Sequence, residues 1–236
     1  MSGSAALPPA GGPAERGSIA AVWFDLYGTL VALDPLIAEC EAVAPGSGFA
    51  LADRWRRRQL EASWLRSLMG AWQPFDVVTR DALRSAATEL AIDQPLGMLD
   101  GAFERLPARP DAVAVLGGLR RRGLLVGVLS NGSGGMIART LTAAGLDGVI
   151  DVWRSVDEVR RYKPDPAVYR LAVERSGVAP DRVAFVTANG WDAAGAAACG
   201  LDVLWLRSSG SEQLPAVGAP MPRVATWEGI VAAIGA

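Results

Sequence analysis

One apolar run near the start of the chain ends in a carboxylate. Residues 20–24 read Ala-Ala-Val-Trp-Phe, and Asp25 follows them directly. A continuous apolar run suits a strand that is buried on both faces of a parallel sheet. Open α/β folds bind ligands at the carboxyl end of such strands, and a buried Asp is costly without partners. Asp25 is therefore expected to be a nucleophile or a metal ligand. The alternative is that it only caps the following turn.

Apolar strands alternate with helices over most of the remaining chain. Strands are expected over 124–129, near 149–153, and over 183–186 and 203–206. Helices are expected over 110–122, from after residue 133 to about 144, and from 163–166 to about 176. Two more are expected from after residue 192 to about 199 and over 227–234. Repeated strand-helix units give a parallel sheet with right-handed crossovers, so the sequence predicts an α/β fold.

The stretch from 34 to 106 interrupts this alternation. It has no convincing strand, and its helices are expected near 34–44, 50–70 and 75–92. We interpret this block as an inserted all-helical cap on a core made of 18–33 and 107–236. Residues 1–17 are rich in Ser, Gly, Pro and Ala, and they are expected to be a disordered tail.

Composition argues against several classes of function. The chain has no histidine, which excludes Ser-His-Asp and Cys-His catalysis and most zinc sites. The net charge of −2 gives no basic field for nucleic acid, and the basic run from Arg54 to Arg58 is interpreted as one solvated helix face. No apolar run reaches ~18 residues, so no membrane span is expected. Two cysteines without metal-ligand spacing favour a reducing cytoplasm as the location.

Polar side chains follow three of the expected strands. Asp25 follows the first, Ser130 and Asn131 the next, and Asn189 and Asp192 a third. Parallel strands bring these ends to one edge of the sheet, and Lys163 at a helix start is placed to reach it. Asn131 alone also fits a turn, and Lys163 alone a surface lysine. Together they supply a nucleophile, hydroxyl and amide donors, a cation and a second carboxylate, and they predict an active site.

Four short segments resemble the motifs of the haloacid dehalogenase superfamily. They are DLYGT at Asp25–Thr29, SNGS at Ser130–Ser133, KPD at Lys163–Asp165 and NGWD at Asn189–Asp192. Three features resemble the L-2-haloacid dehalogenases in particular. They are Tyr27, the NGWD segment and the run from Trp55 to Met69. The resemblance implies a Rossmannoid core with a parallel sheet flanked by helices and an inserted helical cap. It also implies hydrolytic dehalogenation of short-chain L-2-haloacids to D-2-hydroxy acids through an aspartyl ester, with no metal or other cofactor.

The resemblance implies a role for each site residue. Asp25 would attack the carbon that bears the halogen, and Thr29 would orient it. Lys163 and Ser130 would hold the substrate carboxylate, while Asn189 and Asp192 would position and activate water. The halide would meet Asn131, Arg56 and Phe75. The expected catalytic residues are Asp25, Thr29, Arg56, Ser130, Lys163, Thr187, Asn189 and Asp192. The expected substrate-binding residues are Leu26, Tyr27, Arg57, Leu60, Phe75, Ser130, Asn131, Lys163, Tyr169 and Trp191.

Two residues depart from the pattern of these dehalogenases. Arg57 stands where Gln is expected, beside the expected halide site, which leaves the preferred substrate open. Thr187 stands where Ser is expected, and it keeps the hydroxyl. The implied partners are a small 2-haloacid, water and halide, with neither nucleic acid nor membrane. The resemblance also suggests a homodimer.

Three alternative functions remain open on sequence alone. A phosphatase of the same fold normally carries a second Asp two residues after the nucleophile, where this chain has Tyr27. A dehalogenase-like C–N hydrolase that opens azetidine-2-carboxylate would use the same Asp attack, but its leaving amine needs a proton donor. A non-enzymatic binding module has little support, because the whole polar set is present.

Overall fold

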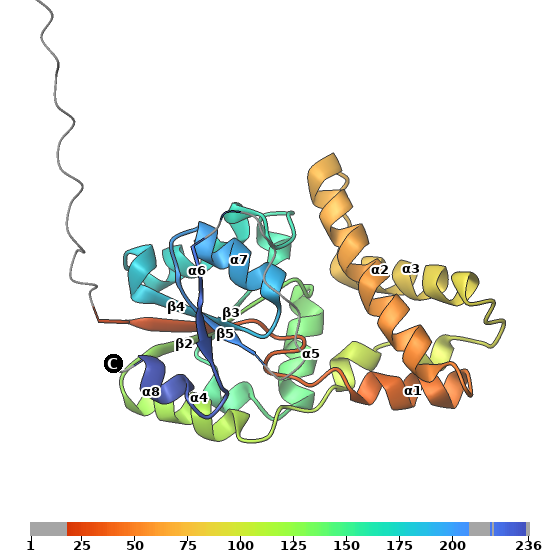
Figure 1. Cartoon of the computed structure of the whole chain (residues 1–236), viewed down its shortest axis with the longest axis horizontal. Helices are drawn as coiled ribbons and strands as arrows, with labels where there is room; N and C mark the ends of the chain where they lie inside the picture. Colours follow the sequence, from red (N-terminus) through yellow and green to blue (C-terminus); the bar gives the residue numbers. More distant parts are fainter. Residues whose placement is uncertain (1–17, 208–217, 219, 235–236) are drawn as a thin grey trace, which may run out of the picture.

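A six-stranded parallel sheet forms the centre of the molecule (Figure 1). The computed structural model describes residues 18–207, 218 and 220–234, so the tail expected over residues 1–17 lies outside the described residues. The spatial order is β3-β2-β1-β4-β5-β6. The strands are β1 (Ala21–Phe24), β2 (Leu125–Ser130), β3 (Val152–Ser155), β4 (Val183–Thr187), β5 (Asp202–Leu206) and β6 (Arg223–Ala225).

Helices cover both faces of this sheet. The α-helices are α1 (Pro35–Val43), α2 (Gly48–Met69), α3 (Phe75–Glu89), α4 (Ala112–Arg121), α5 (Gly134–Ala143), α6 (Pro166–Ser176), α7 (Gly190–Ala198) and α8 (Ile230–Ile234). In Figure 1, α6 and α7 lie on one side of the sheet and α4 and α8 on the other. This is the arrangement that right-handed crossovers give when the chain leaves a central strand in opposite directions. The predicted α/β fold is confirmed.

Strand β1 places the end of its apolar run at the centre of the sheet. All four of its residues are buried, and Phe24 pairs with Val128 of β2 on one side and Val186 of β4 on the other. The crossovers run outward in opposite directions from this point, from β1 to β2 and from β4 to β5. Open α/β sheets bind their ligands at such a switch point. Asp25, the next residue, therefore emerges where a site is expected.

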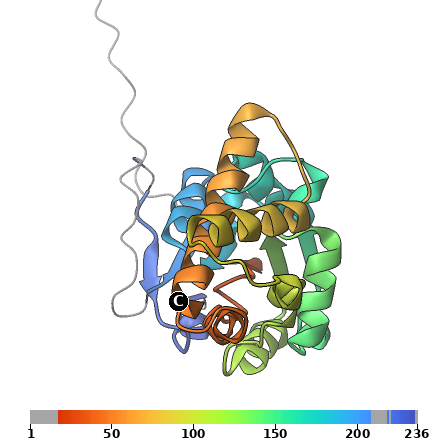
Figure 2. The same cartoon turned by 90° about the vertical axis from the view of Figure 1, so that its right-hand side faces the viewer.

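Helices α1 to α3 stand to one side of the sheet (Figure 1), and Figure 2 shows them in front of it. The Trp55 indole N–H on α2 donates to the carbonyl oxygen of Thr79 on α3 at 2.8 Å. The two segments that connect this block to the core run side by side. The Ala32 N–H donates to the Pro107 carbonyl oxygen at 3.1 Å, and the Arg109 N–H donates to the Leu30 carbonyl oxygen at 2.8 Å. These paired crossings support the proposed division into a core and an inserted cap.

Some elements differ from those that the pattern predicts. Strand β6 was not expected, because three residues after a Pro-rich stretch carry no apolar run. Strand β3 begins later than predicted, since residues Asp147–Val149 form the 3₁₀ helix η3. Further 3₁₀ helices form at η1 (Gly97–Leu99), η2 (Ala102–Arg105), η4 (Val156–Glu158) and η5 (Pro180–Arg182). None of the helices in the described ranges combines the length and the apolar character needed to cross a membrane.

Candidate active site

The Asp25 carboxylate is held by three donors from three different parts of the chain. The Thr29 hydroxyl donates to Oδ2 at 3.0 Å, and the Asn189 side-chain amide donates to the same oxygen at 2.8 Å. The Lys163 ammonium donates to Oδ1 at 3.1 Å. A carboxylate oxygen has about two lone-pair sites, so the two donors at Oδ2 fill them. Among the described residues, Oδ1 accepts one hydrogen bond and keeps a lone pair, which leaves it the more available oxygen for bond formation.

Lys163 links the two buried carboxylates of the site. Its Nζ lies 3.1 Å from Asp25 Oδ1 and 3.0 Å from Asp192 Oδ2, and its side chain is fully buried. It also lies over the Phe185 ring, 4.8 Å from the ring centre. A compact ammonium with three donors fits between two carboxylates better than a planar guanidinium does. Lys163 is also the single lysine of the chain, a compositional signal that the motif analysis did not use.

Asp192 is anchored from its other side by Tyr169 on α6. The Tyr169 hydroxyl donates to Asp192 Oδ1 at 2.7 Å, so each oxygen of this carboxylate has a donor. Burial raises the pKa of Asp192 to about 6, and the Lys163 charge and the Tyr169 hydroxyl limit the rise. Gly195 on α7 makes room for this contact, because a Cβ there would lie 2.6 Å from the Tyr169 hydroxyl. Asp192 is therefore a fully buried carboxylate with a donor at each oxygen.

Hydrogen bonds join the turn after β1 to the end of β4 around Asp25. The Thr29 hydroxyl oxygen accepts the Ala188 N–H at 3.0 Å while its proton goes to Asp25. The Thr187 hydroxyl accepts the Asn189 N–H at 3.1 Å. Gly28 makes the first turn possible, since its φ of +87° is strained for any residue with a Cβ. The hydroxyl at Thr187 thus orients the segment that carries Asn189, which itself donates to Asp25.

The turn after β2 brings Ser130 and Asn131 to the same edge of the sheet. The Asn131 side-chain oxygen accepts the Lys163 N–H at 2.9 Å, which fixes the start of the Lys163 segment. The Ser130 hydroxyl is fully buried and accepts the Gly132 N–H at 3.0 Å. That contact leaves the proton of Ser130 available to a ligand.

Tyr27 forms an aromatic wall between the core and the α1–α3 block. Its hydroxyl makes a hydrogen bond of 3.0 Å with that of Thr140 on α5, and burial raises its pKa well above the usual value. The positive charge of Arg56 on α2 acts in the opposite direction on this pKa. The Phe103 ring meets Tyr27 edge-on at 5.6 Å and Trp55 edge-on at 5.0 Å.

Of the remaining residues expected to bind substrate, all but Arg57 are buried or half-buried. Leu26 and Phe75 are fully buried, while Leu60 and Trp191 are half-buried, with the Trp191 ring packed on Trp64 at 5.5 Å. Arg57 does not join them. Its side chain is 73% exposed and pairs with Asp53 on the same helix at 3.0 Å. The arginine that replaces the expected Gln therefore lies on the outer face of α2.

Tyr162 ties the α2–α3 turn to the segment that carries Lys163, a contact that sequence reasoning did not find. Its backbone N–H donates to the Ser67 hydroxyl at 2.8 Å, and its ring stacks on Trp72 at 4.8 Å and tilts against Phe75 at 5.6 Å. The only sequence signal was an aromatic residue directly before Lys163.

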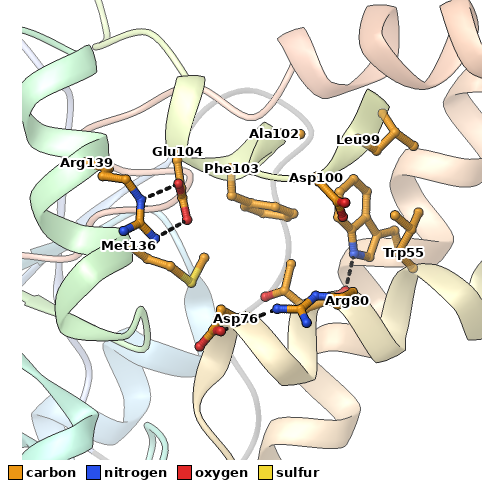
Figure 3. Close-up of a pocket in the computed structure, with 13 residues that line it drawn as sticks. Trp55, Asp76, Arg80, Leu99, Asp100, Ala102, Phe103, Glu104, Met136 and Arg139 are labelled. Atoms are coloured by element: carbon orange, nitrogen blue, oxygen red, sulfur yellow. Dashed lines mark hydrogen bonds and ion pairs between the residues drawn. The ribbon is translucent and has the colours of Figure 1, made fainter. Parts of the chain in front are cut away.

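A separate cleft of about 380 Å³ is lined by Trp55 on α2, Asp76 on α3, Phe103 on η2 and Arg139 on α5 (Figure 3). Its walls carry the ion pair of Glu104 with Arg139, at 2.5 and 2.7 Å, and Phe103 lies between the two sides of the view. Asp25, Lys163 and Asp192 do not line this cleft, so it is distinct from the carboxylate cluster. Within the described ranges, no three His, Cys, Asp or Glu side chains gather into a group that could hold a metal ion.

Comparison with known proteins agrees with this geometry. The family model described as a haloacid dehalogenase-like hydrolase matches residues 19–200. The chain is 38% identical over 192 residues to the (S)-2-haloacid dehalogenase of Pseudomonas putida, which covers 80% of this chain and 85% of that protein. The crystal structure of the L-2-haloacid dehalogenase RSc1362 has a TM-score of 0.88 and 38% identity, covering 93% of this chain and 100% of that one.

A second solved structure is the L-2-haloacid dehalogenase of Xanthobacter autotrophicus with chloropropionic acid covalently bound. It has a TM-score of 0.83 and 32% identity, and the match covers 92% of this chain and 98% of that one. The chain therefore belongs to the haloacid dehalogenase-like hydrolases, and within them it groups with the L-2-haloacid dehalogenases.

Proposed function

We propose that this protein hydrolyses the carbon-halogen bond of short-chain L-2-haloacids and releases D-2-hydroxy acids through an ester on Asp25. The observation that carries the proposal is the asymmetric holding of the Asp25 carboxylate. Both lone pairs of Oδ2 are taken by Thr29 and Asn189, whereas Oδ1 has one contact, to Lys163. A fixed, partly desolvated carboxylate with one available oxygen is a competent nucleophile.

In the first step, Asp25 Oδ1 attacks C2 of the substrate from the side opposite the halogen. The C2–O bond forms as the C2–halogen bond breaks, and the halide leaves with the bonding electron pair. This displacement inverts C2. The substrate carboxylate is held by the Ser130 hydroxyl, which keeps its proton for a ligand, and by the Lys163 ammonium. Arg56 supplies positive charge where the halide departs.

In the second step, water attacks Cγ of the Asp25 ester. The Cγ–O bond breaks, and the oxygen that was Oδ1 leaves as the hydroxyl of the product. Asn189 orients the water, and ionised Asp192 takes one of its protons, which then passes to the departing oxygen as the Cγ–O bond breaks. Because the bond to C2 is not broken in this step, the inverted configuration survives.

We propose that no metal ion takes part in either step. The Lys163 ammonium lies between Asp25 and Asp192, where a cation would otherwise offset two negative charges. The second acid that metal-dependent relatives carry in the first motif is replaced by Tyr27, whose buried hydroxyl stays protonated because its pKa is raised. A departing halide needs less charge compensation than a phosphoryl group does.

Halide release tests the proposed function and its alternatives together. The protein is treated with EDTA and given L-2-chloropropionate, its D isomer, azetidine-2-carboxylate or a phosphate monoester. The expected result is chloride from the L isomer alone, with no gain on adding Mg²⁺. Ring opening of the azetidine, or phosphate release restored by Mg²⁺, would instead support the C–N hydrolase or the phosphatase.

Replacing Arg56 with Ala should lower the rate of halide release by at least ~100-fold, the scale for losing one preorganised charge stabiliser. The matched control is Arg58→Ala, on the same helix. Arg58 pairs with Glu61 and Glu89 at the surface, at 2.5 Å each, so its loss should leave both stability and rate close to those of the wild type. Equal small effects at both positions would show that the basic run is only a solvated face.

Replacing Tyr169 with Phe should move the acid side of the activity–pH profile to higher pH. Activity should fall as pH drops through about 6, because burial raises the pKa of Asp192 to about 6 and protonation removes the base. The Tyr169 hydroxyl favours the ionised form, so its loss raises that pKa further and moves the fall toward neutral pH. Profiles of kcat/KM for both proteins check this, and an unchanged acid side would exclude Asp192 as the titrating group.

A further inference from the structure

A chain of hydrogen bonds inside the α2–α3 pair ends on Arg56. The Arg56 guanidinium donates through Nη1 to the side-chain oxygen of Gln59 at 2.7 Å, one helical turn further along α2. The Gln59 amide nitrogen donates to the Thr79 hydroxyl oxygen on α3 at 2.7 Å. That hydroxyl donates in turn to the Phe75 carbonyl oxygen at 2.6 Å. Gln59 is fully buried and Thr79 is 8% exposed, so water does not compete with the inner part of the chain.

The direction of this chain is fixed by chemistry. A guanidinium has donors only, so the oxygen of the Gln59 amide must face Arg56. The amide nitrogen then faces Thr79, whose proton is already committed to the Phe75 carbonyl. Turning the amide over would set two donors against each other at Arg56, which has no acceptor to offer. Only one arrangement satisfies every group, and it holds Arg56 in one orientation.

One further contact strengthens this anchor. The Thr79 carbonyl oxygen accepts the Trp55 indole N–H at 2.8 Å, so α2 contacts both polar groups of this one residue. The chain ends at Phe75, which is fully buried and is the first residue of α3. Arg56 and Phe75, the two α2–α3 residues assigned to the halide, are therefore fixed relative to each other through Gln59 and Thr79.

We infer that Gln59 is a positioning residue that aims the Arg56 guanidinium at the departing halide, an inference that rests on the proposed function. A neutral amide suits this task because it orients the guanidinium and adds no negative charge that would oppose the halide. Gln59 itself touches neither substrate nor halide. Its effect appears in the step where negative charge develops on the leaving atom.

The test compares leaving groups. Gln59→Leu should slow single-turnover halide release from L-2-chloropropionate by about 10- to 100-fold, the range for misplacing one charge-assisted hydrogen bond. The loss for L-2-bromopropionate should be clearly smaller, because bromide needs less stabilisation as it leaves. Thr79→Val removes the far anchor and should change the chloride-to-bromide ratio in the same direction. Thr79→Ser keeps the hydroxyl and should restore the wild-type ratio.

A second readout separates this inference from the proposed function. Bromide binding is followed by quenching of tryptophan fluorescence in wild type, Gln59→Leu and Thr79→Val. Loss of bromide affinity in both variants supports the positioning role even if the wild type releases no halide from haloacids. Normal affinity and a normal chloride-to-bromide ratio in folded variants would overturn the role while leaving the proposed function intact. A wild type that neither binds bromide nor releases halide would overturn both.

Discussion

Replacing Asp25 with Asn should abolish halide release while the protein still folds. Asn has the same shape, but its nitrogen cannot attack C2 as the carboxylate oxygen does. The expected loss is at least about 10⁴-fold, the scale for removing a catalytic nucleophile. Folding should be weakened by only about 1–3 kcal/mol, because one end of the new amide must face a donor at Thr29, Asn189 or Lys163. Halide assays and urea unfolding check the two parts separately.

The matched control is Asp53→Asn, which removes a surface carboxylate that pairs with Arg57. It should retain the wild-type rate. Substantial turnover in Asp25→Asn would mean that water, and not Asp25, attacks the substrate.

Replacing Lys163 with Met should damage both activity and stability. The rate should fall by at least about 10³-fold, because one donor to the substrate carboxylate and to Asp25 is lost. Removing one partner of a buried ion pair costs about 3–5 kcal/mol, since Asp25 and Asp192 would be left facing each other without a cation.

The stability loss in this variant should depend on pH in a defined direction. Burial already raises the pKa of Asp192 above that of an unfolded chain, and loss of the Lys163 charge raises it further. A raised folded-state pKa favours the folded protein at low pH and penalises it as pH rises through that pKa. The difference in the free energy of unfolding between Lys163→Met and the wild type should therefore be largest at neutral pH and shrink toward pH 5.

Arg161→Met is the control for this variant. Arg161 lies two residues away and approaches Asp165 at the surface at 3.9 Å. Its loss should change neither the rate nor the pH dependence of unfolding. Urea unfolding of both variants at pH 5 and pH 7 makes the comparison, and a pH-independent loss in Lys163→Met would argue against the paired-carboxylate account.

The sequence predicted the position of the carboxylate cluster because its residues lie at strand ends. Asp25 follows a continuous apolar run, which predicts a strand buried on both faces, and Asn189 follows the neighbouring strand β4. Once the strands are parallel, both side chains must meet at one edge of the sheet. Lys163 follows no strand, and its place was inferred from its position at the start of a helix.

The contacts between helices were not predictable in the same way. Gln59 reads as one more polar residue in a charged helix, and only the packing of α2 on α3 turns its amide toward Thr79. Arg57 and Arg56 are adjacent in sequence, yet the helical turn sends Arg57 outward to Asp53. Side-chain direction of this kind depends on tertiary packing, which a single sequence does not encode locally. The homodimer and the cytoplasmic location stay predictions.

One measurement tests the ester on Asp25 most directly. The enzyme, in excess over L-2-chloropropionate, carries out a single turnover in water enriched in oxygen-18. The masses of the product and of the peptide that contains Asp25 are then measured by mass spectrometry. The account predicts one heavy oxygen in Asp25 and none in the 2-hydroxypropionate, because water attacks Cγ and the original Oδ1 leaves with the product. Heavy oxygen in the product of that first turnover, with none in the peptide, would contradict it.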